Sequence, residues 1–407
     1  MRYRRSDFAT PVSGPAALWE SLRAPTRFTP SAYERSVNLS CRRRRLHSVG
    51  DTGSRTISDL YGLDALAEPW SALTAERSSA PSDGFLWSKA AAQTFQREYS
   101  LSVRVIGNGT QALVIAPLAQ RRGYLPRLEI LGVSELSEPS DFVYRDEAAL
   151  KEFIRELLAE GRPLFLKRVP ATSPTVRILS DLCNRRGLAL VRPAGSTPWL
   201  PLDDGAKEPE DRFNSGRRSD LRRLRRKAEA LGKVEVRLLS PTAAEVDDAL
   251  LEAFSVEDHS WKGRAGSSLL RNSRSGTFFR TYATLAARAG TLRVALLHVG
   301  GKPAAMQLAV EERGRLSLLK IGYDDSLQAC SPGTLLLLES VRYAMHRGLQ
   351  GVDFLGTEAP WTKAWTERSR PCVAVRAYPA GLRSAALLAA EGVEHGWHHL
   401  KERLIHR

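Results

Sequence analysis

The feature of this sequence that most constrains its fold is an order of predicted secondary-structure elements that occurs twice. Apolar periodicity and glycine turns predict each element. The first copy is a strand hairpin, a third strand, a helix that ends at glycine and a further strand: 101–106, 112–116, 127–131, 147–160 and 163–167. The second copy has the same elements in the same order: 292–299, 303–310, 315–323, 334–347 and 352–356. Internal similarity on this scale predicts two related halves in one chain.

Further predicted elements flank both copies. Helical spacing before the first copy covers 63–76 and 85–98, and a helix at 174–186 with a strand at 188–191 follows it. A helix at 275–288 stands before the second copy. Each half therefore combines a mainly antiparallel run of strands with helices, so the predicted class is α+β, with α/β layers in both halves.

The sequence divides into a tail, two halves and a terminal helix. We predict a tail at 1–57, halves at 58–205 and 206–380, and a C-terminal helix at 381–407. The tail is basic, rich in Arg, Ser and Pro, and lacks an apolar period, which predicts disorder. Its composition also suits a transit peptide, although its prolines would interrupt an amphipathic helix. A dispensable extension is the other interpretation.

Composition limits the compartment and the partners. The chain has 407 residues, 43% of them hydrophobic, but no run approaches the roughly 20 apolar residues of a membrane span. We therefore predict a soluble protein without a transmembrane segment. The four cysteines are far apart and form no CxxC pair, which fits a reducing cytoplasm. A formal charge of +15 predicts attraction to anions such as nucleic acids, acidic lipids or phosphorylated cofactors.

Motifs for several other chemistries are missing. The sequence contains no GxSxG elbow, Walker loop or kinase motif set. His395, His398 and His399, with Glu391 and Glu402, could share a face of the C-terminal helix. Most such clusters face solvent and no other ligand set is evident, so we predict no metal.

Six segments of the second half occur in the order found in one acyltransferase family. They are 213–227, 260–263, 297–305, 322–324, 331–333 and 353–356, followed by Lys363 and Trp365. In this order they resemble the CelD/BcsL-like, FemAB-like branch of the GNAT acyltransferase superfamily. The resemblance is clearest over 213–365 and weaker over 70–202. It implies tandem GNAT-like halves, each a mixed, mainly antiparallel sheet flanked by helices, with the active site in the second half.

The resemblance also implies an activity. GNAT proteins transfer an acetyl or other acyl group from acyl-CoA to an amine or hydroxyl, without a metal. CelD/BcsL-like proteins are associated with polysaccharide biosynthesis, which suggests a glycan or cell-envelope precursor as acceptor. Two alternatives stay open. FemAB-like proteins use aminoacyl-tRNA as donor, and a basic chain can also be a non-catalytic nucleic-acid-binding or scaffold protein. The sequence does not predict the oligomeric state.

A helix start in the second half is the predicted cofactor-binding position. Ser331 and Gly333 precede or open the helix that continues from Thr334, where free backbone N–H groups favour a pyrophosphate. In a GNAT protein this position meets coenzyme A. The usual loop there is longer, basic and Gly-rich, whereas here it reads Gln-Ala-Cys-Ser-Pro-Gly. An ordinary helix cap with proline is the alternative.

The strand before that helix supplies the predicted catalytic residues. Lys320, Tyr323 and Asp324 would lie at the same cleft if the core is GNAT-like. The Tyr323 hydroxyl could protonate the departing thiolate, and Asp324 could position or deprotonate the acceptor. The alternative is that Tyr323 and Asp324 only form a turn.

Two loops supply the predicted substrate-binding residues. Trp261 and Lys262 offer an apolar face and a cation in a flap over the acceptor, with His259 as a candidate base. A loop anchor and a solvated histidine are the alternatives. After the last strand of the repeat, the resemblance implies that Asp353, Lys363 and Trp365 line the acceptor site, Lys363 contacting the acceptor or its phosphates. A structural Asp353–Lys363 salt bridge is the alternative.

The most basic segment of the sequence, residues 217–227, is predicted to lie on a helix. Leu221, Leu224, Ala228 and Leu231 form its apolar stripe, and the charged residues Arg218, Arg222, Arg225 and Arg226 face away. One interpretation is a solvated basic helix. Another is a site for phosphates of coenzyme A or of the acceptor, and we assign Arg218 and Arg222 to it. Under the aminoacyl-tRNA alternative, the helix would contact tRNA.

Overall fold

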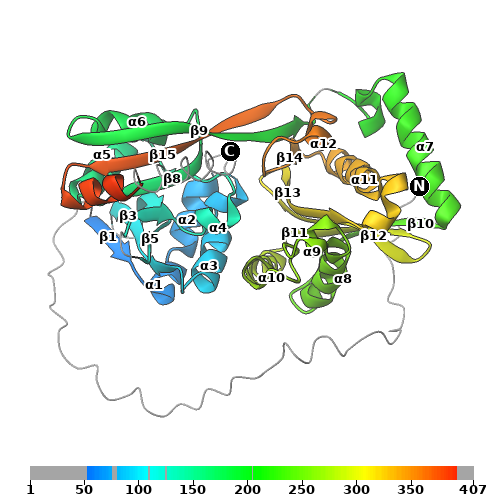
Figure 1. Ribbon diagram of the computed structural model, residues 1–407, viewed down its shortest axis with the longest axis horizontal. Coiled ribbons are helices and arrows are strands. Elements are labelled where there is room, and N and C mark those ends of the chain that lie inside the picture. The colour runs from blue at the N-terminus through cyan, green and yellow to red at the C-terminus, as the bar shows by residue number, and fades with distance from the viewer. Residues whose placement is uncertain (1–52, 76–79, 109–110, 124–125, 204, 392–407) are drawn as a thin grey trace, which may run out of the picture. The chain divides into compact units, whose positions relative to one another are not determined.

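A computed structural model describes residues 53–75, 80–108, 111–123, 126–203 and 205–391 (Figure 1). The chain from Gly50 onward forms one compact unit. Most of the predicted tail, 1–52, lies outside the described residues. Its end does not: Gly53–Ile57 forms strand β1, which pairs antiparallel with β3. The boundary predicted at residue 57 is therefore wrong, because β3 supplies a partner that local composition cannot reveal.

The first half contains the elements of the first predicted copy with extra breaks. In order they are α1 (Leu60–Asp64), α2 (Ala67–Ala75), α3 (Phe85–Thr94), β2 (Tyr99–Leu101), β3 (Val103–Asn108), β4 (Gln111–Ala116), β5 (Leu118–Arg121), β6 (Leu128–Ile130), α4 (Val133–Leu136), β7 (Val143–Tyr144), α5 (Glu147–Ala159), β8 (Leu164–Pro170), α6 (Pro174–Cys183) and β9 (Gly187–Pro201). Ser102 and Pro117 separate β2 from β3 and β4 from β5. Proline has no N–H for a strand ladder, which accounts for the second break.

The second half follows its predicted order closely. Its elements are α7 (Ser215–Leu231), β10 (Val234–Leu239), α8 (Val246–Asp258), α9 (Trp261–Arg264), α10 (Ser273–Arg288), β11 (Leu292–Val299), β12 (Lys302–Glu312), β13 (Arg315–Tyr323), the 3₁₀ helix η5 (Asp325–Cys330), α11 (Pro332–His346), β14 (Gly351–Asp353), α12 (Pro360–Lys363) and β15 (Ser369–Pro379). Residues 382–391 are helical. Of the candidate metal face only Glu391 is described, and His395, His398, His399 and Glu402 lie outside the described residues.

Both halves contain the same crossover from a strand through a helix to a parallel strand. In the second half β13 and β14 are parallel and α11 connects them. In the first half β6 and β8 are parallel, and α5 lies between them in the chain. The predicted α+β class with two related halves is confirmed.

The two halves exchange their last strands. The large sheet has eleven strands in the order β10-β11-β12-β13-β14-β9-β15-β8-β6-β5-β2. Strand β9 of the first half pairs with β14 through Trp199–Pro201, and β15 of the second half pairs with β8 (Figure 1). The two exchanged strands also pair with each other over most of their length. The halves therefore share one hydrogen-bonded sheet, and neither completes its own sheet alone.

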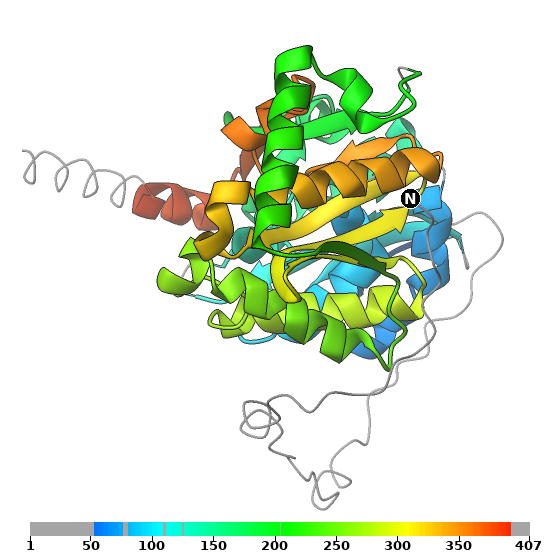
Figure 2. The same cartoon turned by 90° about the vertical axis from the view of Figure 1, so that its right-hand side faces the viewer.

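Helices cover the second-half part of the sheet on two faces. Helix α8 packs on β12 from one face, and α11 packs on β11 to β13 from the other (Figure 2). The largest apolar cluster continues from α8 and α10 into the first half. There Trp87 of α3 contacts Phe278 at a 4.7 Å centroid distance and Tyr282 at 5.0 Å. These aromatic contacts form a second connection between the halves.

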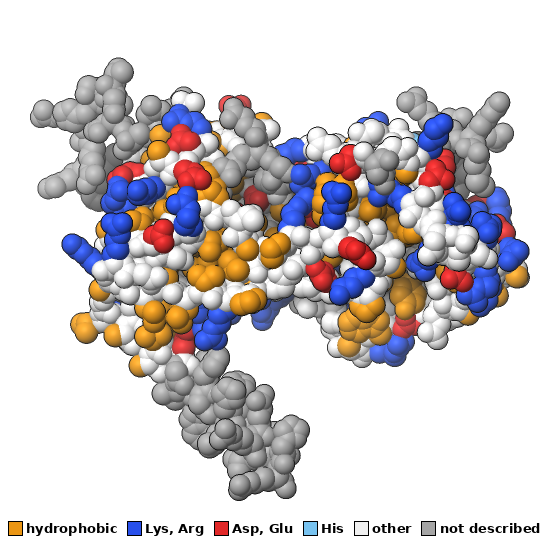
Figure 3. Space-filling model, turned by 90° about the horizontal axis from the view of Figure 1, so that it is seen from above, with side chains coloured by type: hydrophobic (Ala, Val, Ile, Leu, Met, Phe, Trp, Pro, Cys, Tyr) orange, Lys and Arg blue, Asp and Glu red, His pale blue; other side chains and the backbone are white. Residues whose placement is uncertain are grey.

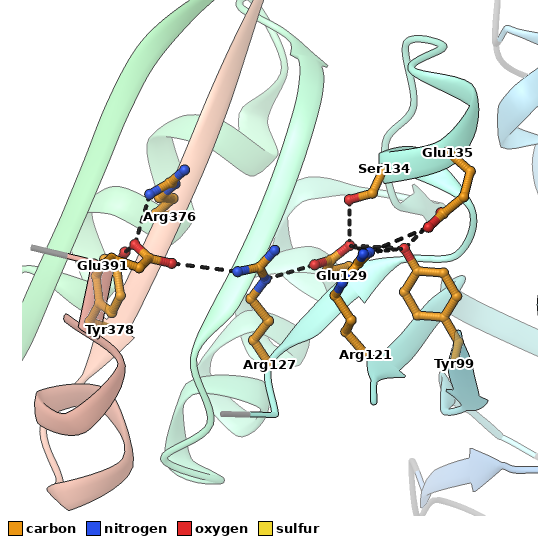
Figure 4. A network of polar contacts seen from close by, with 9 residues as sticks. All are labelled: Tyr99, Arg121, Arg127, Glu129, Ser134, Glu135, Arg376, Tyr378 and Glu391. Atoms are coloured by element: carbon orange, nitrogen blue, oxygen red, sulfur yellow. Dashed lines mark hydrogen bonds and ion pairs between the residues drawn. The ribbon is translucent and has the colours of Figure 1, made fainter. Parts of the chain in front are cut away.

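A polar network attaches the C-terminal helical residues to the first half (Figure 4). Glu391 accepts hydrogen bonds from Arg376 at 2.7 Å and from the Tyr378 hydroxyl at 2.5 Å, and lies 3.5 Å from Arg127. Arg127 also bonds the fully buried Glu129 at 2.6 Å. Every charge of this network has an opposite charge or a donor beside it, which accounts for its burial. Among the described helices, none is long and apolar enough to cross a membrane.

Candidate functional site

The candidate site lies where the parallel strands β13 and β14 diverge. Their pairing covers only Arg315–Ser317 against Gly351–Asp353. Strand β13 then continues to Tyr323, whereas the chain leaves β14 at Phe354, whose N–H bonds the Pro198 carbonyl at 3.2 Å. Ligands of open sheets bind beyond the carboxyl ends of parallel strands, where the connections turn away.

A β-bulge at Leu319 sets which way the side chains of β13 point. Leu308 pairs with Lys320 and Ala309 pairs with Leu318, so Leu319 is an extra residue on β13. A bulge leaves that residue outside the regular ladder and reorients the side chains beside it. Leu319 belongs to the cluster that contains α8 and α10, and Tyr323 packs on the cluster that contains the start of α11.

The Lys320 side chain occupies the α8–α10 face of this split. Its Nζ lies 4.6 Å from the centroid of Phe279 on α10. Within the described parts of the chain, no carboxylate lies within 4 Å of that Nζ. Burial lowers the pKa of Lys320, an effect opposed by the charges of Glu138 and Glu257 and reinforced by Lys262. The site therefore holds a half-buried amine whose charged form is disfavoured.

Tyr323 does not lie with Lys320. The Tyr323 ring is on the α11 face, and a Cβ placed on Gly333 would meet its Cδ1 at 3.5 Å. Asp324 caps η5, with its Oδ1 accepting from the Ser326 N–H at 2.8 Å. The three predicted catalytic residues are thus divided between the two faces of β13, with Tyr323 beside the start of α11.

The start of α11 offers fewer donors than a typical phosphate loop. Ser331 has a left-handed backbone with φ 47°, and Pro332 has no N–H. The Thr334 and Leu335 N–H groups bond the Ser331 carbonyl at 3.0 and 3.2 Å. Of this first turn, only the Gly333 N–H has no backbone acceptor in the described structure. Ser331 and Thr334 therefore shape the turn, and Gly333 supplies its available donor.

The predicted flap is tied firmly to α8 and β13. Lys262 Nζ donates to Glu257 Oε1 at 2.7 Å and to the Ile321 carbonyl at 2.8 Å. Glu257 is buried, and its second oxygen accepts from the Leu269 N–H at 2.8 Å. Gly263 contacts the Asp258 carbonyl so closely that a Cβ would lie 1.8 Å from it. Lys262 is thus an anchor between the flap and the end of β13.

Two other predicted residues of this flap remain accessible. Trp261 is 57% exposed, so its indole is available to a ligand. His259 ends α8, with its Nδ1 2.8 Å from the Ser255 carbonyl, and is exposed. Both residues lie on the α8 side of the split, the side that holds Lys320.

The residues predicted after β14 separate into buried and accessible ones. Asp353 is buried and accepts from Arg370 at 2.7 Å, so the alternative of an Asp353–Lys363 salt bridge is wrong. Trp365 is 9% exposed and packs edge-on against Phe213 at 5.1 Å, which accounts for it as a core residue. Lys363 is exposed, 3.8 Å from Glu358, and lines a surface pocket of about 300 Å³.

The predicted basic helix is α7, and its cations differ in how they are paired. Arg223 bonds Asp220 at 2.9 Å, and Arg225 bonds Glu229 at 2.9 Å. Within the described residues, Arg218, Arg222, Arg226 and Lys227 have no carboxylate within 4 Å. Lys227 Nζ is 3.5 Å from the Ala329 carbonyl, just before α11. Figure 3 shows Lys and Arg side chains gathered at the end of the molecule where α7 lies.

The predicted apolar stripe of α7 is right only in part. Leu221 and Ala228 are buried against the core, whereas Leu231 is 57% exposed. Arg225, predicted to face away, is partly buried and lies 3.7 Å from Glu339 of α11. The contact with α11 accounts for the partial burial of Arg225, and Leu231 is the last residue of α7. Helical spacing alone does not show where a helix ends or which helix it contacts.

Sequence reasoning missed two buried charges at this site, Glu138 and Arg168 of the first half. Glu138 accepts from the Gly356 N–H at 3.2 Å, and Arg168 donates to the Gly356 carbonyl. Burial raises the pKa of Glu138, while Lys320, Arg168 and the Gly356 N–H oppose that shift. No local motif marks either residue, because their partners are about 190 to 220 positions away in the sequence. In the described residues no group of three or more potential metal ligands occurs.

Comparisons with known proteins agree with this geometry. Residues 215–363 match the family described as an acetyltransferase (GNAT) domain. FemX has a similar fold, with a TM-score of 0.54 and 11% identity, over 81% of this chain and 97% of FemX. A conserved protein of unknown function from Bacteroides thetaiotaomicron has a TM-score of 0.51 and 13% identity, over 81% of this chain and all of that protein. No curated protein matches the sequence.

Proposed function

We propose that this chain, which carries a GNAT acetyltransferase domain at residues 215–363, transfers an acyl group from acyl-CoA to an amine or hydroxyl acceptor. The divergence of β13 and β14 around the bulge at Leu319 carries the proposal. It leaves backbone groups of β13 without strand partners, in a gap that an extended pantetheine arm and a thioester would fill. A bulge N–H can then bind the oxyanion that forms on the thioester carbonyl.

The donor phosphates would lie on the α11 side. The start of α11 offers one free backbone donor, Gly333, so backbone groups alone supply little of the phosphate site. Arg222, Arg226 and Lys227 of α7 provide exposed cations beside η5, and Arg218 extends the row. Residues four apart share a helix face, so Arg218, Arg222 and Arg226 form one line suited to several phosphates.

The acceptor would lie on the α8 side. Trp261 offers an exposed aromatic face, and His259 is two residues before it. Lys320 lies on the same side of β13, over Phe279 of α10. Burial lowers the pKa of Lys320, which favours its neutral amine, and that amine could accept a proton from the acceptor. Lys363, accessible beside α12, would contact the acceptor or its phosphates.

The reaction would proceed by direct attack. The acceptor nitrogen or oxygen forms a bond to the thioester carbonyl carbon, and the carbon–sulfur bond breaks as the tetrahedral intermediate collapses. The acceptor proton leaves to a base on the α8 side, and Tyr323 on the α11 side protonates the coenzyme A thiolate. The free oxygen of Asp324 would help to orient the acceptor. The division of these residues between two faces suits a reaction in which donor and acceptor approach from opposite sides.

The acceptor class we propose is a glycan or cell-envelope precursor, and the compartment is the cytoplasm. The resemblance to CelD/BcsL-like proteins supports the acceptor class. Acyl-CoA as donor and three buried free thiols, Cys183, Cys330 and Cys372, support a reducing compartment.

Calorimetric titration with acetyl-CoA and coenzyme A tests the donor. The variant Arg222→Gln/Arg226→Gln/Lys227→Gln is expected to weaken binding about tenfold, because exposed cations each contribute under about 1 kcal/mol. Arg223→Gln is the matched control, since Asp220 already pairs that side chain. Absence of any binding to the wild-type protein would refute the proposal. Mass spectrometry of glycans from cells with and without the protein would then identify the acceptor.

The row of arginines on α7 also favours a second candidate, transfer from aminoacyl-tRNA. Arg218, Arg222 and Arg226 are four residues apart on one helix face, so they could bind the phosphates of a polynucleotide backbone as well as those of a single cofactor. Binding of tRNA that weakens steeply with salt, and that the same triple variant abolishes, would support this donor. We expect no tRNA binding at a salt concentration where acetyl-CoA still binds.

A further inference from the structure

Side chains of the first half bond both the backbone N–H and the backbone carbonyl of Gly356. Its N–H donates to Glu138 Oε2 at 3.2 Å, and its carbonyl accepts from Arg168 Nη2. Arg168 also donates to the Ser137 carbonyl at 2.6 Å and to Thr197 Oγ1 at 3.1 Å. Arg168 and Glu138 are 4% and 8% exposed. The two buried charges therefore clamp a segment that belongs to the other half.

The clamped segment has an unusual backbone. Leu355 and Gly356 have φ values of 50° and 49°, in the left-handed region. Such a conformation costs about 1 kcal/mol or more for a non-glycine residue and persists only where its surroundings enforce it. Asp353 holds the Leu355 N–H at 3.1 Å from within the second half, and the clamp holds Gly356. This segment leaves β14 at the point where β13 and β14 diverge.

Glu138 also acts on Lys320. The charged groups that influence the Lys320 amine are Glu138 from the first half and Glu257 and Lys262 from α8 and the flap. Glu257 already has two partners of its own, Lys262 and the Leu269 N–H. Glu138 has one backbone donor at 3.2 Å. It is therefore the carboxylate most available to balance the charge on Lys320.

We infer that Glu138 and Arg168 are positioning residues of the transferase site, contributed by the first half: they fix the Leu355–Gly356 segment, and Glu138 adds a buried carboxylate to the site that holds Lys320. This inference rests on the proposed function for its catalytic consequence. The first half then acts as part of the active site of the second, which gives the strand exchange a functional role.

Titration of Lys320 tests the electrostatic part without turnover. The full chain, labelled with ¹³C at the lysine Cε, would be followed by NMR against pH, and Lys320→Arg identifies its signal. In Glu138→Gln the Lys320 midpoint is expected to fall by about one pH unit, because an opposite charge that favours the ammonium is lost. In Glu138→Asp, which keeps the charge, the midpoint should stay nearer the wild-type value.

Arg104→Lys is the matched control. Arg104 is also a buried arginine of the first half, paired with Glu160 at 2.7 Å, and its partners belong to the first half. This variant should leave the Lys320 midpoint unchanged. An equal midpoint in wild type and a folded Glu138→Gln would overturn the inference. If Glu138→Gln did not fold, Glu138→Ala would be titrated in its place, and an unchanged Lys320 midpoint in a folded Glu138→Ala would also overturn the inference.

Turnover tests the clamp. Arg168→Lys keeps the charge but cannot bridge three acceptors, so kcat with acetyl-CoA is expected to fall about tenfold while the KM for acetyl-CoA changes less than threefold. Arg104→Lys should retain both values. Equal kcat in wild type and Arg168→Lys would refute a positioning role. The NMR titration needs no donor, so a failure of acyl-CoA binding would refute the proposed function while leaving the coupling of Glu138 to Lys320 measurable.

Discussion

Replacement of Gly322 by alanine is expected to force β13 and α8 apart. A Cβ on Gly322 would lie 3.0 Å from Glu257 Cα, 3.1 Å from its Cβ and 3.2 Å from its Cγ. All three separations are shorter than ordinary carbon–carbon contacts, so α8 must move by a few tenths of an ångström. Overpacking of this kind costs about 1–3 kcal/mol in the free energy of unfolding. The movement would also separate Lys262 from the Ile321 carbonyl, now at 2.8 Å.

Gly333→Ala provides the comparison, with the same chemical change close by. There the Cβ would meet the Tyr323 ring at 3.5 Å, an ordinary contact, within a helix. Alanine loses less backbone entropy than glycine on folding, so this variant is expected to gain about 0.4–1 kcal/mol. Urea unfolding of both variants, followed by tryptophan fluorescence, measures the two changes. Equal or greater stability of Gly322→Ala than wild type would refute the close approach of α8 to β13.

Three further predictions concern stability. Trp365→Ala should lower the free energy of unfolding in urea by about 3–5 kcal/mol, because it empties a core site beside Phe213. Trp261→Ala, at an exposed position, should change that free energy by less than about 0.5 kcal/mol and should instead raise the KM for the acceptor. Burial, helped by Asp141, raises the pKa of Asp83 from 3.8 to about 7. The folded state therefore binds the Asp83 proton more tightly than the unfolded state does. The stabilisation that this proton gives the folded state is complete below pH 3.8 and is lost as the pH rises to about 7. Between these pH values the free energy of unfolding should fall less steeply with pH in Asp83→Asn than in wild type, by up to about 1.4 kcal/mol per pH unit. An equal slope in the two proteins would contradict the raised pKa of Asp83. Finally, residues 206–391 expressed alone should aggregate or remain unfolded, because β14 loses its β9 partner and β15 loses β8; a folded monomer by gel filtration and circular dichroism would contradict the strand exchange.

Local pattern accounts for the order of elements in both halves. The predicted strand 292–299 coincides with β11, and 315–323 coincides with β13, because apolar runs between turn residues define both. The strand predicted at 188–191 is much too short, since β9 extends over Gly187–Pro201. Much of β9 is exposed, so apolar content does not mark it, and its partners β14 and β15 are distant in sequence.

The repeated order of strands and helices determined the fold class, since periodicity and turn chemistry are local properties of the chain. The order of six segments in the second half, through a family resemblance, predicted the site there. Only the tertiary structure decided which residues meet. The bulge at Leu319 brings the consecutive residues Leu319 and Lys320 to the same α8–α10 face of β13, where regular alternation would place them on opposite faces. The exchange of β9 and β15 brings Glu138 and Arg168 to Gly356. Such contacts depend on long-range pairing and burial, which no window of sequence contains.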